Sequence, residues 1–416
     1  MRAMKDSGIE WIEEIPEKWD IVKLKYYSYM KGRIGWQGLG SSDFIDEGPY
    51  CVTGTDFING KVNWETCYHV SEERYEMDKF IQIQVGDLLI TKDGTIGKLA
   101  KITELPDKAC LNSHLLIIRP LHNRFSNEYL YYVLSSYVFW KYYTIHSSGS
   151  IMASLSQEKL KDFSFPVPSL KEQQLLVSYL DRKCAHIDNI IEKTKASVEE
   201  YKKLRQAVIT QAVTKGVRGD RPMKDSGIEW IGEIPQEWDI ISLKYLCNMY
   251  AGKNLVSEQI APEGEYPVYG GNGIRGYYNE YNCEGNNLLV GRQGALCGNV
   301  HRVSGKFWAT EHAVITTNTT YCIMDYLFYL LIGMNLNQYV SSTAAQPGLS
   351  VSTIQNVKTC FVPFEEQQEI AEYLDKKCTE IDSLISKKEQ FLTELESYKK
   401  SMIYEYVTGK KEVPQA

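Results

Sequence analysis

The sequence lacks the features that mark several large classes of protein. It has no apolar run near the ~20 residues that a membrane helix needs, and its opening stretch, MRAMKDSGIEWIEEIPEKWD, has no apolar segment typical of a secretory signal. Its 10 cysteines are scattered, without a C-x-x-C pair or a close Cys/His cluster, which argues against disulfides and zinc. We therefore expect a reduced, cytoplasmic protein without a membrane segment or a metal site.

Catalytic motifs are missing as well. The sequence has no P-loop, no G-x-S-x-G and no HExxH, and it lacks the N-P-P-[FYW] or D-P-P-Y type of motif expected of an amino-methyltransferase. Residues 271–276 (GNGIRG) fit G-x-G-x-x-G, but YYNEYNCEGN follows where a dinucleotide site needs a helix. A glycine-rich turn is the favoured interpretation. These absences disfavour a self-sufficient nuclease or methyltransferase, and no catalytic residue is assigned.

Charge limits the function less sharply. The formal net charge is −7 over 416 residues, which argues against indiscriminate nucleic-acid binding over the whole surface. A local basic cleft is still compatible with this charge, because only the surface that faces phosphate has to be positive. The length is enough for two or three domains.

What the sequence does contain is a long predicted helix at residues 170–212. The stretch has no Pro or Gly and is rich in Leu, Glu, Lys, Gln and Ala. Ser169 and Glu172 have the spacing of a capping box at its start. Small and apolar residues then step by four and three along one face, as in a coiled-coil seam. This predicted seam begins with Leu180, Cys184, Ile187 and Ile191 and continues past one short step at Tyr201 and Leu204.

A second copy of this helix occurs at residues 366–407. Shifted by 194 residues, it is identical at 11 of the first 21 aligned positions from Lys171 and Glu365 onward. The seam recurs at Leu374, Cys378, Ile381 and Ile385 and later includes Leu395, Tyr398 and Met402. Because each helix follows its own copy of a globular stretch, we predict that the two pack as an antiparallel coiled coil about a pseudo-twofold axis.

The whole chain is a tandem duplication. Residues 4–26 and 223–245 match at 18 of 23 positions, which chance does not produce. We predict a globular domain at 1–168, a long helix at 169–216, a linker at 217–222, a second globular domain at 223–363, and a second long helix with a C-terminal tail at 364–416. Both globular parts combine apolar strands, a Gly-containing turn and an aromatic helix, at 128–143 and 324–340. The fold class is therefore mixed α/β (α+β).

The two globular parts have diverged in their loops, while their ends and the helices are nearly duplicated. This favours one shared mechanical role for the two scaffolds and different recognition by the two domains. Loop residues at equivalent places carry side chains suited to DNA, since Arg pairs with guanine and Gln with adenine, and Lys or Thr contacts phosphate or base edges. Our candidates for DNA binding are Lys31, Arg33, Lys92, Thr95, Ser148, Lys253, Asn272, Arg292, Gln293, Thr343 and Gln346. His114 and His312 fall on apolar strands and are predicted to be hydrogen-bonded core residues.

The sequence resembles the specificity (S) subunits of type I restriction–modification systems. The resemblance rests on the repeated G-I-E-W-I-x-E-I-P-x-x-W starts, the P-S-L-K-E-Q-Q and V-P-F-E-E-Q-Q helix starts, and the Y-L-D-x-K-C-x-x-I-D helices, and it covers both repeats. It implies that each globular region is a target recognition domain reading one half of a split DNA sequence. It also implies that the two helices set the half-site spacing and dock two methyltransferase (M) subunits, with motor–nuclease (R) subunits joining them.

By the same resemblance the chain is non-catalytic and binds no cofactor itself. S-adenosylmethionine, ATP and Mg²⁺ would belong to the partner subunits. Two alternatives stay open at this point: the specificity subunit of a methylation-only system, and a coiled-coil adaptor that binds proteins without reading DNA. The target sequence, the spacer length and the stoichiometry with R subunits do not follow from the sequence.

Overall fold

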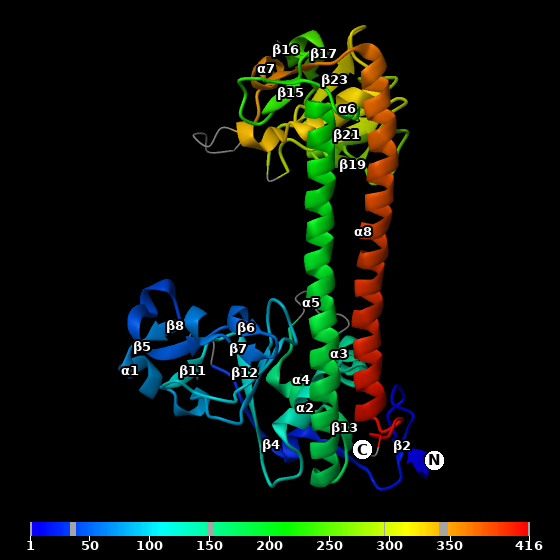
Figure 1. Cartoon of the computed structure of the whole chain (residues 1–416). Coiled ribbons are helices and arrows are strands. Elements are labelled where there is room, and N and C mark those ends of the chain that lie inside the picture. The colour runs from blue at the N-terminus through cyan, green and yellow to red at the C-terminus, as the bar shows by residue number, and fades with distance from the viewer. Residues whose placement is uncertain (1, 34–38, 148–153, 295, 341–347, 415–416) are drawn as a thin grey trace. The chain divides into compact units, whose positions relative to one another are not determined.

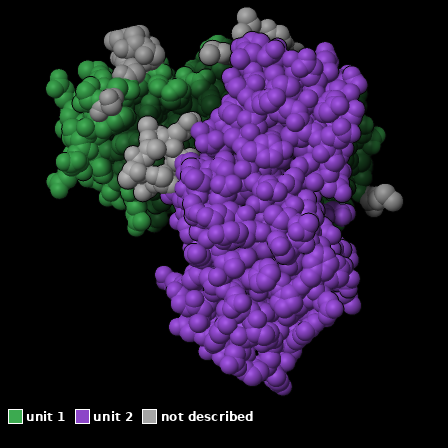
Figure 2. Space-filling model, turned by 90° about the horizontal axis from the view of Figure 1, so that it is seen from above, with its two compact units in different colours: residues 1–193, 391–416 green, residues 194–390 purple. Residues whose placement is uncertain are grey.

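The computed structural model describes residues 2–33, 39–147, 154–294, 296–340 and 348–414. The chain divides into two compact units, which Figure 2 shows in green and purple. Unit 1 comprises residues 1–193 and 391–416, and unit 2 comprises residues 194–390. Each unit therefore contains one globular repeat together with parts of both long helices.

The two long helices are α5 (Leu170–Lys215), of 46 residues, and α8 (Phe364–Val407), of 44 residues (Figure 1, green and orange to red). The Glu172 N–H donates to Ser169 Oγ at the start of α5 (3.4 Å), so the serine half of the predicted capping box forms, while the Glu172 carboxylate accepts from Arg2 and Trp19. Gly216 and Gly409 follow the helix ends with φ of +75° and +73°, a left-handed conformation that stops a helix and that glycine adopts without a Cβ penalty.

In unit 1 the two helices run antiparallel. The Tyr179 ring packs against Tyr406 (centroids 4.8 Å apart). Further along α5 and further back along α8, Asp188 accepts from Lys399 Nζ at 2.6 Å. Residue numbers thus rise along one helix while they fall along the other. The seam residues Leu180, Cys184 and Ile187 are buried and Ile191 is half-buried, all in a core that also contains Met402, Ile403, Tyr406 and Val407.

Unit 2 repeats this pairing with the helix roles exchanged. Arg205 Nε lies 2.8 Å from Asp382 Oδ1, and these two residues are the 194-residue counterparts of Lys399 and Asp188. Leu374 and Cys378 are buried in one core with Ile209, Ala212, Val213 and Ile370. Ile381 is buried and Ile385 half-buried. The prediction of an antiparallel helix pair within a mixed α/β duplication is confirmed.

The short step predicted in the seam is wrong. Leu204 is 49% exposed and its counterpart Tyr398 is 59% exposed, whereas Arg205 and Lys399 take the seam positions and form the ion pairs described above. The helices keep the regular spacing of four and three, and a long basic side chain covers apolar surface with its stem while its charged end reaches a carboxylate.

The globular repeats are built from short strands and helices. In unit 1 these are β1 (Met4–Asp6), β2 (Glu14–Pro16), β3 (Asp20–Lys23), β4 (Ser28–Lys31), β5 (Phe44–Val52), β6 (Phe57–Ile58), β7 (Lys61–Val62), β8 (Tyr68–Val70), α1 (Glu72–Glu76), β9 (Leu88–Thr91), β10 (Leu99–Lys101), β11 (Ala109–Leu111), β12 (Leu115–Pro120), α2 (Asn127–Ser135), α3 (Tyr137–Ser147), α4 (Gln157–Lys161) and β13 (Ser164–Val167). In unit 2 they are β14 (Met223–Asp225), β15 (Glu233–Pro235), β16 (Asp239–Ser242), β17 (Cys247–Ala251), β18 (Tyr266–Gly270), β19 (Gly273–Tyr278), β20 (Asn287–Gly291), β21 (Val300–Val303), β22 (Trp308–Ala309), β23 (Ala313–Asn318), α6 (Met324–Gly333), α7 (Val351–Asn356) and β24 (Lys358–Phe361).

Sheet topology shows that the repeats share one fold. The four-stranded sheet has the order β10-β9-β12-β4 in unit 1 and β21-β20-β23-β17 in unit 2. The three-stranded sheets, β11-β5-β8 and β22-β18-β19, each combine a parallel and an antiparallel pair. The G-x-G-x-x-G stretch, residues 271–276, covers the tight turn after β18 and the beginning of β19, as the glycine-turn interpretation predicts. Divergence has changed the loops and left the strand order intact.

Each predicted aromatic helix is interrupted. α2 and α3 are separate helices because Ser136 breaks the run, its hydroxyl donating to the Val133 carbonyl oxygen and accepting from the Val138 N–H. In unit 2, α6 ends before Asn335, whose φ of +44° turns the chain into a short 3₁₀ helix at Leu336–Tyr339. Serine favours such a break because its hydroxyl bonds to nearby backbone, and asparagine favours it because it tolerates the left-handed conformation better than most residues.

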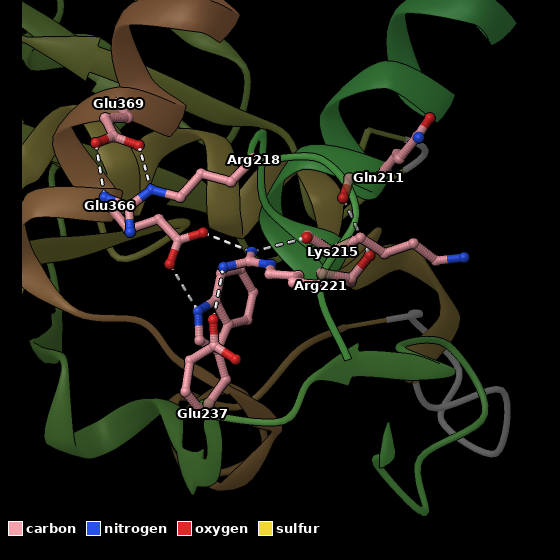
Figure 3. A network of polar contacts seen from close by, with 9 residues as sticks. Gln211, Lys215, Arg218, Arg221, Glu237, Glu366 and Glu369 are labelled. Carbon is pink, nitrogen blue, oxygen red and sulfur yellow. Dashed lines mark hydrogen bonds and ion pairs between the residues drawn. The ribbon is translucent and has the colours of Figure 1, made fainter. Parts of the chain in front are cut away.

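The start of the second repeat is anchored to helix ends by a buried ion pair (Figure 3). Arg221 Nη2 donates to Glu366 Oε1 (2.5 Å) and to the Lys215 carbonyl oxygen (2.9 Å). The indole N–H of Trp238, which is fully buried, donates to the other oxygen of Glu366 (2.9 Å). Arg221 therefore ties the end of α5 to the start of α8, and Trp238 fixes the repeat on the same carboxylate.

Unit 1 contains the same device at positions shifted by the repeat. Arg2 Nη1 donates to Glu172 (2.7 Å), Arg2 Nη2 donates to the Gly409 carbonyl oxygen (2.9 Å), and Trp19 Nε1 donates to Glu172 (3.0 Å). The second tryptophan of the repeated W-I-x-E-I-P-x-x-W segment thus docks each globular repeat on the helices of its own unit. Within the described residues, no helix combines the length and the apolar character needed to cross a membrane.

Candidate functional site

A backbone frame at the end of a buried strand presents the first candidate residue. Lys92 follows β9, whose residues are all buried. The Lys92 N–H donates to the His114 carbonyl oxygen (2.9 Å), and the Lys92 carbonyl oxygen accepts from the Leu155 N–H (2.8 Å). The main chain at Lys92 is therefore fixed on both sides, while its side chain stays partly exposed.

Unit 2 contains the same frame around an arginine. Arg292 follows the buried strand β20, its N–H donates to the His312 carbonyl oxygen (3.0 Å), and its carbonyl oxygen accepts from the Leu349 N–H (2.9 Å). Gln293 forms an isolated bridge with Gly348. We call this arrangement the recognition frame: a basic residue whose backbone is held between a histidine carbonyl and a leucine amide.

The recognition frame leads into a tight hairpin in each unit. Gly94 and Gly294 have φ of +68° and +84°, a conformation that side chains rarely adopt. In unit 1 the hydroxyl of Thr91 accepts from the Lys98 N–H (2.9 Å) and closes the turn. Thr95 is exposed at the tip. These short, closed turns give the polar side chains a rigid base, as recognition of a base edge requires.

Three further predicted residues lie on the surface. Lys31 ends β4 with its ammonium over the Phe80 ring (5.4 Å to the centroid). Lys253 is exposed beyond β17. The Asn272 side-chain oxygen accepts from Asn299 Nδ2 (2.8 Å), so it holds the glycine-rich hairpin against the neighbouring turn. Each of these three residues stays available as a candidate DNA contact.

Arg33 corrects the sequence-based expectation. It is only 2% exposed, its Nε donates to the Leu111 carbonyl oxygen (2.9 Å), and one Nη lies 3.4 Å from Cys110 Sγ. Because the side chain points into the interior and not into a loop, we remove it from the candidate DNA contacts. Three candidates, Ser148, Thr343 and Gln346, lie outside the described residues.

The two histidines predicted to be core residues are not in the core. The side chain of His114 is 65% exposed, and that of His312 is 38% exposed. The apolar strand begins only at Leu115, so His114 belongs to the turn before it. His114 Nδ1 lies 3.5 Å from Asp93 Oδ2, and His312 Nε2 lies 3.2 Å from Glu311 Oε1. Each recognition frame therefore includes a histidine–carboxylate pair.

The frame of unit 2 has unmet hydrogen-bonding capacity. Arg292 Nε, Glu311 Oε2, His312 Nδ1 and Thr310 Oγ1 are buried atoms without a hydrogen-bond partner among the described residues. Leaving a buried polar atom unpaired costs about 1–3 kcal/mol, and native proteins contain few such atoms. All four atoms belong to residues at or next to the frame of unit 2.

The sequence predicted Lys92 and Arg292 as candidate DNA contacts, and the structure places their backbones in equivalent frames; their role stays a prediction. The same sequence pattern assigned His114 and His312 to the core and gave Glu311 no role, although the two histidines recur at one place in both repeats. Among the described residues, no group of three or more His, Cys, Asp or Glu side chains could hold a metal ion.

Comparison with known proteins gives a consistent picture. Residues 35–200 and 235–394 match the family described as the type I restriction modification DNA specificity domain. The chain is 34% identical over 315 residues to the type I restriction enzyme EcoprrI specificity subunit of Escherichia coli, covering 72% of this chain and 73% of that one. It is 26% identical over 422 residues to the putative MjaX specificity subunit of Methanocaldococcus jannaschii, covering 96% and 95%. A chain from a solved type I restriction–modification complex has the same fold, with a TM-score of 0.71 at 16% identity, covering 95% of this chain and 99% of that one.

Proposed function

Because the chain belongs to the type I restriction–modification DNA specificity family, we propose that its two globular repeats each read one half of an asymmetric, bipartite DNA target. Specificity subunits are the non-catalytic, DNA-recognising components of these systems, and this chain is not an enzyme.

The observation that carries the proposal is the duplicated recognition frame. Both units fix a basic residue by the same two backbone hydrogen bonds, yet one frame presents Lys92 and the other Arg292. Arginine can bond to guanine O6 and N7 with two donors at once, whereas lysine has a single ammonium. Equivalent frames with different side chains support two half-sites of different sequence, so the target need not be a palindrome.

The long helices support a role in spacing. A continuous helix of 46 residues spans about 69 Å at 1.5 Å per residue. In dimeric DNA readers a rigid connection fixes the distance between half-sites. We propose the same for α5 and α8, which would also dock two M subunits, with R subunits completing the restricting complex. S-adenosylmethionine, ATP and Mg²⁺ are assigned to those partners, and the cytoplasm is the proposed location.

The test is a genome-wide map of methylated bases in source cells with and without this gene. We expect methylation at one asymmetric, gapped motif to disappear with the gene. Loss of two unrelated continuous motifs would contradict the spacing role of the helices. If no motif changes, the purified chain and its M subunit are tested for binding to genomic DNA fragments. Failure to select any sequence would refute DNA reading and favour an adaptor that binds only proteins.

A further inference from the structure

The two recognition frames obtain a carboxylate from opposite sides. In unit 1 the acid is Asp93, directly after Lys92, and the residue before His114 is Ser113. In unit 2 the residue after Arg292 is Gln293, and the acid is Glu311, directly before His312. The carboxylate position has thus changed between the repeats, but each frame keeps one acid in contact with its histidine (3.5 and 3.2 Å).

The presence of an acid next to a proposed DNA contact needs a reason. A carboxylate is an acceptor only, and it is repelled by the phosphates that dominate DNA affinity. Its favourable partner on DNA is therefore a donor on a base edge, and Asp or Glu accepts from the N4 amino group of cytosine in the major groove. The neighbouring cation suits guanine, so a cation and a carboxylate together supply the complementary donor and acceptor for G and C.

We propose, resting on the DNA-reading function above, that Asp93 and Glu311 are specificity-determining acceptors for a cytosine amino group, and that His114 and His312 are positioning residues that orient them. The side chains of Asp93 and Glu311 are 38% and 39% exposed, so part of each lies at the surface, although the Oε2 atom of Glu311 is itself buried. The histidine nitrogen that faces each acid lies 3.5 Å from Asp93 Oδ2 or 3.2 Å from Glu311 Oε1, and the role assigned to it is to limit the rotation of that carboxylate.

The ring nitrogen that faces the acid differs between the two histidine–carboxylate pairs, and this difference determines which substitution of each histidine tests its role. His114 contacts Asp93 through Nδ1, whereas His312 contacts Glu311 through Nε2. An asparagine amide reproduces a donor at the first position and a glutamine amide at the second. His114→Asn and His312→Gln should therefore rescue what His114→Ala and His312→Ala lose, and a purely structural histidine would not follow this split.

The experiment uses the full chain together with its M subunit in cells without other DNA methyltransferases. The isosteric variants Asp93→Asn and Glu311→Gln are compared with Glu263→Gln, an exposed glutamate in the loop before β18, and methylated bases are mapped. In each frame variant we expect discrimination at one C·G position to fall roughly tenfold or more, the value of one good base contact. Asp93→Asn should affect one half-site and Glu311→Gln the other, and Glu263→Gln should leave every position unchanged.

Failure of this inference differs from failure of the proposed function. If the unmodified complex methylates no gapped motif, the proposed function fails. If it does, but the variants keep every position or relax a position that is not C·G, the acceptor role is overturned. Should a variant abolish methylation, its complex is tested for binding to duplexes with single changes in the unmodified target. Retained discrimination at the C·G position then overturns the proposal, and its loss supports it.

Discussion

Replacing Glu366 by alanine should loosen the start of the second repeat far more than the equivalent change loosens the first. Glu366 is 1% exposed and accepts from both Arg221 and Trp238. Its removal leaves a mostly buried guanidinium without its main partner and a buried indole N–H without an acceptor. Breaking a buried ion pair in this way costs about 3–5 kcal/mol. Arg221 keeps Glu237 (3.0 Å) and the Lys215 carbonyl, which places the expected cost at the lower end.

The equivalent residue in unit 1 gives the comparison. Glu172 makes the same bonds to Arg2 and Trp19, but it is 34% exposed and Arg2 is 24% exposed. Water can replace part of what is lost, so Glu172→Ala should cost about 1.5 kcal/mol, the lower end of the about 1.5–3 kcal/mol that a hydrogen bond to a charged group contributes.

Backbone hydrogen exchange measures both effects, because local opening of each anchor exposes its own amides. Glu366→Ala should speed exchange over residues 223–245 by roughly a hundredfold or more, and Glu172→Ala should speed it over residues 4–26 by about tenfold, since each 1.4 kcal/mol is a factor of ten. Glu369→Ala is the matched control, because Glu369 forms a two-bond ion pair with Arg218 on the exposed surface. Equal effects of Glu366→Ala and Glu369→Ala would refute the reasoning from burial.

Four further outcomes are expected. Arg292→Ala should relax recognition in one half-site and Lys92→Ala in the other, by about 1–3 kcal/mol at one base pair, and a methylation map that shows equal loss at both halves would contradict the assignment. Matched deletion of whole turns from α5 and α8 should change the spacer of the target, and altered half-site letters in the same map would count against the spacing role. Gly291→Ala would place a Cβ 2.0 Å from the Gly271 carbonyl oxygen, so thermal unfolding should show a loss of about 1–3 kcal/mol; an unchanged midpoint would mean that the hairpin yields. Burial raises the pKa of the Cys184 thiol to about 11, so at pH 8 the reactive thiolate is scarce. A thiol reagent should therefore modify Cys184 only after denaturation, which peptide mass analysis measures.

Much of the fold was predictable because its signals are local and repeated. The long helices follow from a steady apolar period without Pro or Gly, and the duplication predicts their pairing. The prediction of the seam failed at Leu204 because a search for apolar residues selects leucine over arginine. The helix instead keeps its regular spacing, with the aliphatic stem of Arg205 at the seam and its charged end in an ion pair with Asp382. That choice depends on a residue far away in the sequence.

The site was less predictable because it depends on single positions. His114 precedes the apolar run L-L-I-I, so a strand that begins one residue earlier would bury it; the observed strand starts at Leu115, and one residue changes which side faces water. Arg33 shows the opposite error, since its position near a loop gave no sign of the interior carbonyl of Leu111 that it binds. Exposure at strand ends is decided by tertiary contacts that the residue pattern does not contain.

The internal duplication supplies part of the information that the residue pattern lacks, because the same fold occurs twice with different side chains. Strand order, the anchors at Glu172 and Glu366, and the two backbone hydrogen bonds of the recognition frame are the same in both repeats. The acid has moved from one side of the frame to the other, as Asp93 and Glu311 show. An exposed ion pair contributes at most about 1 kcal/mol, so stability gives little reason to keep an acid beside each histidine while its position changes. The proposed function accounts for both observations, because two domains that read different half-sites would share a backbone frame and differ in the charged groups that it presents.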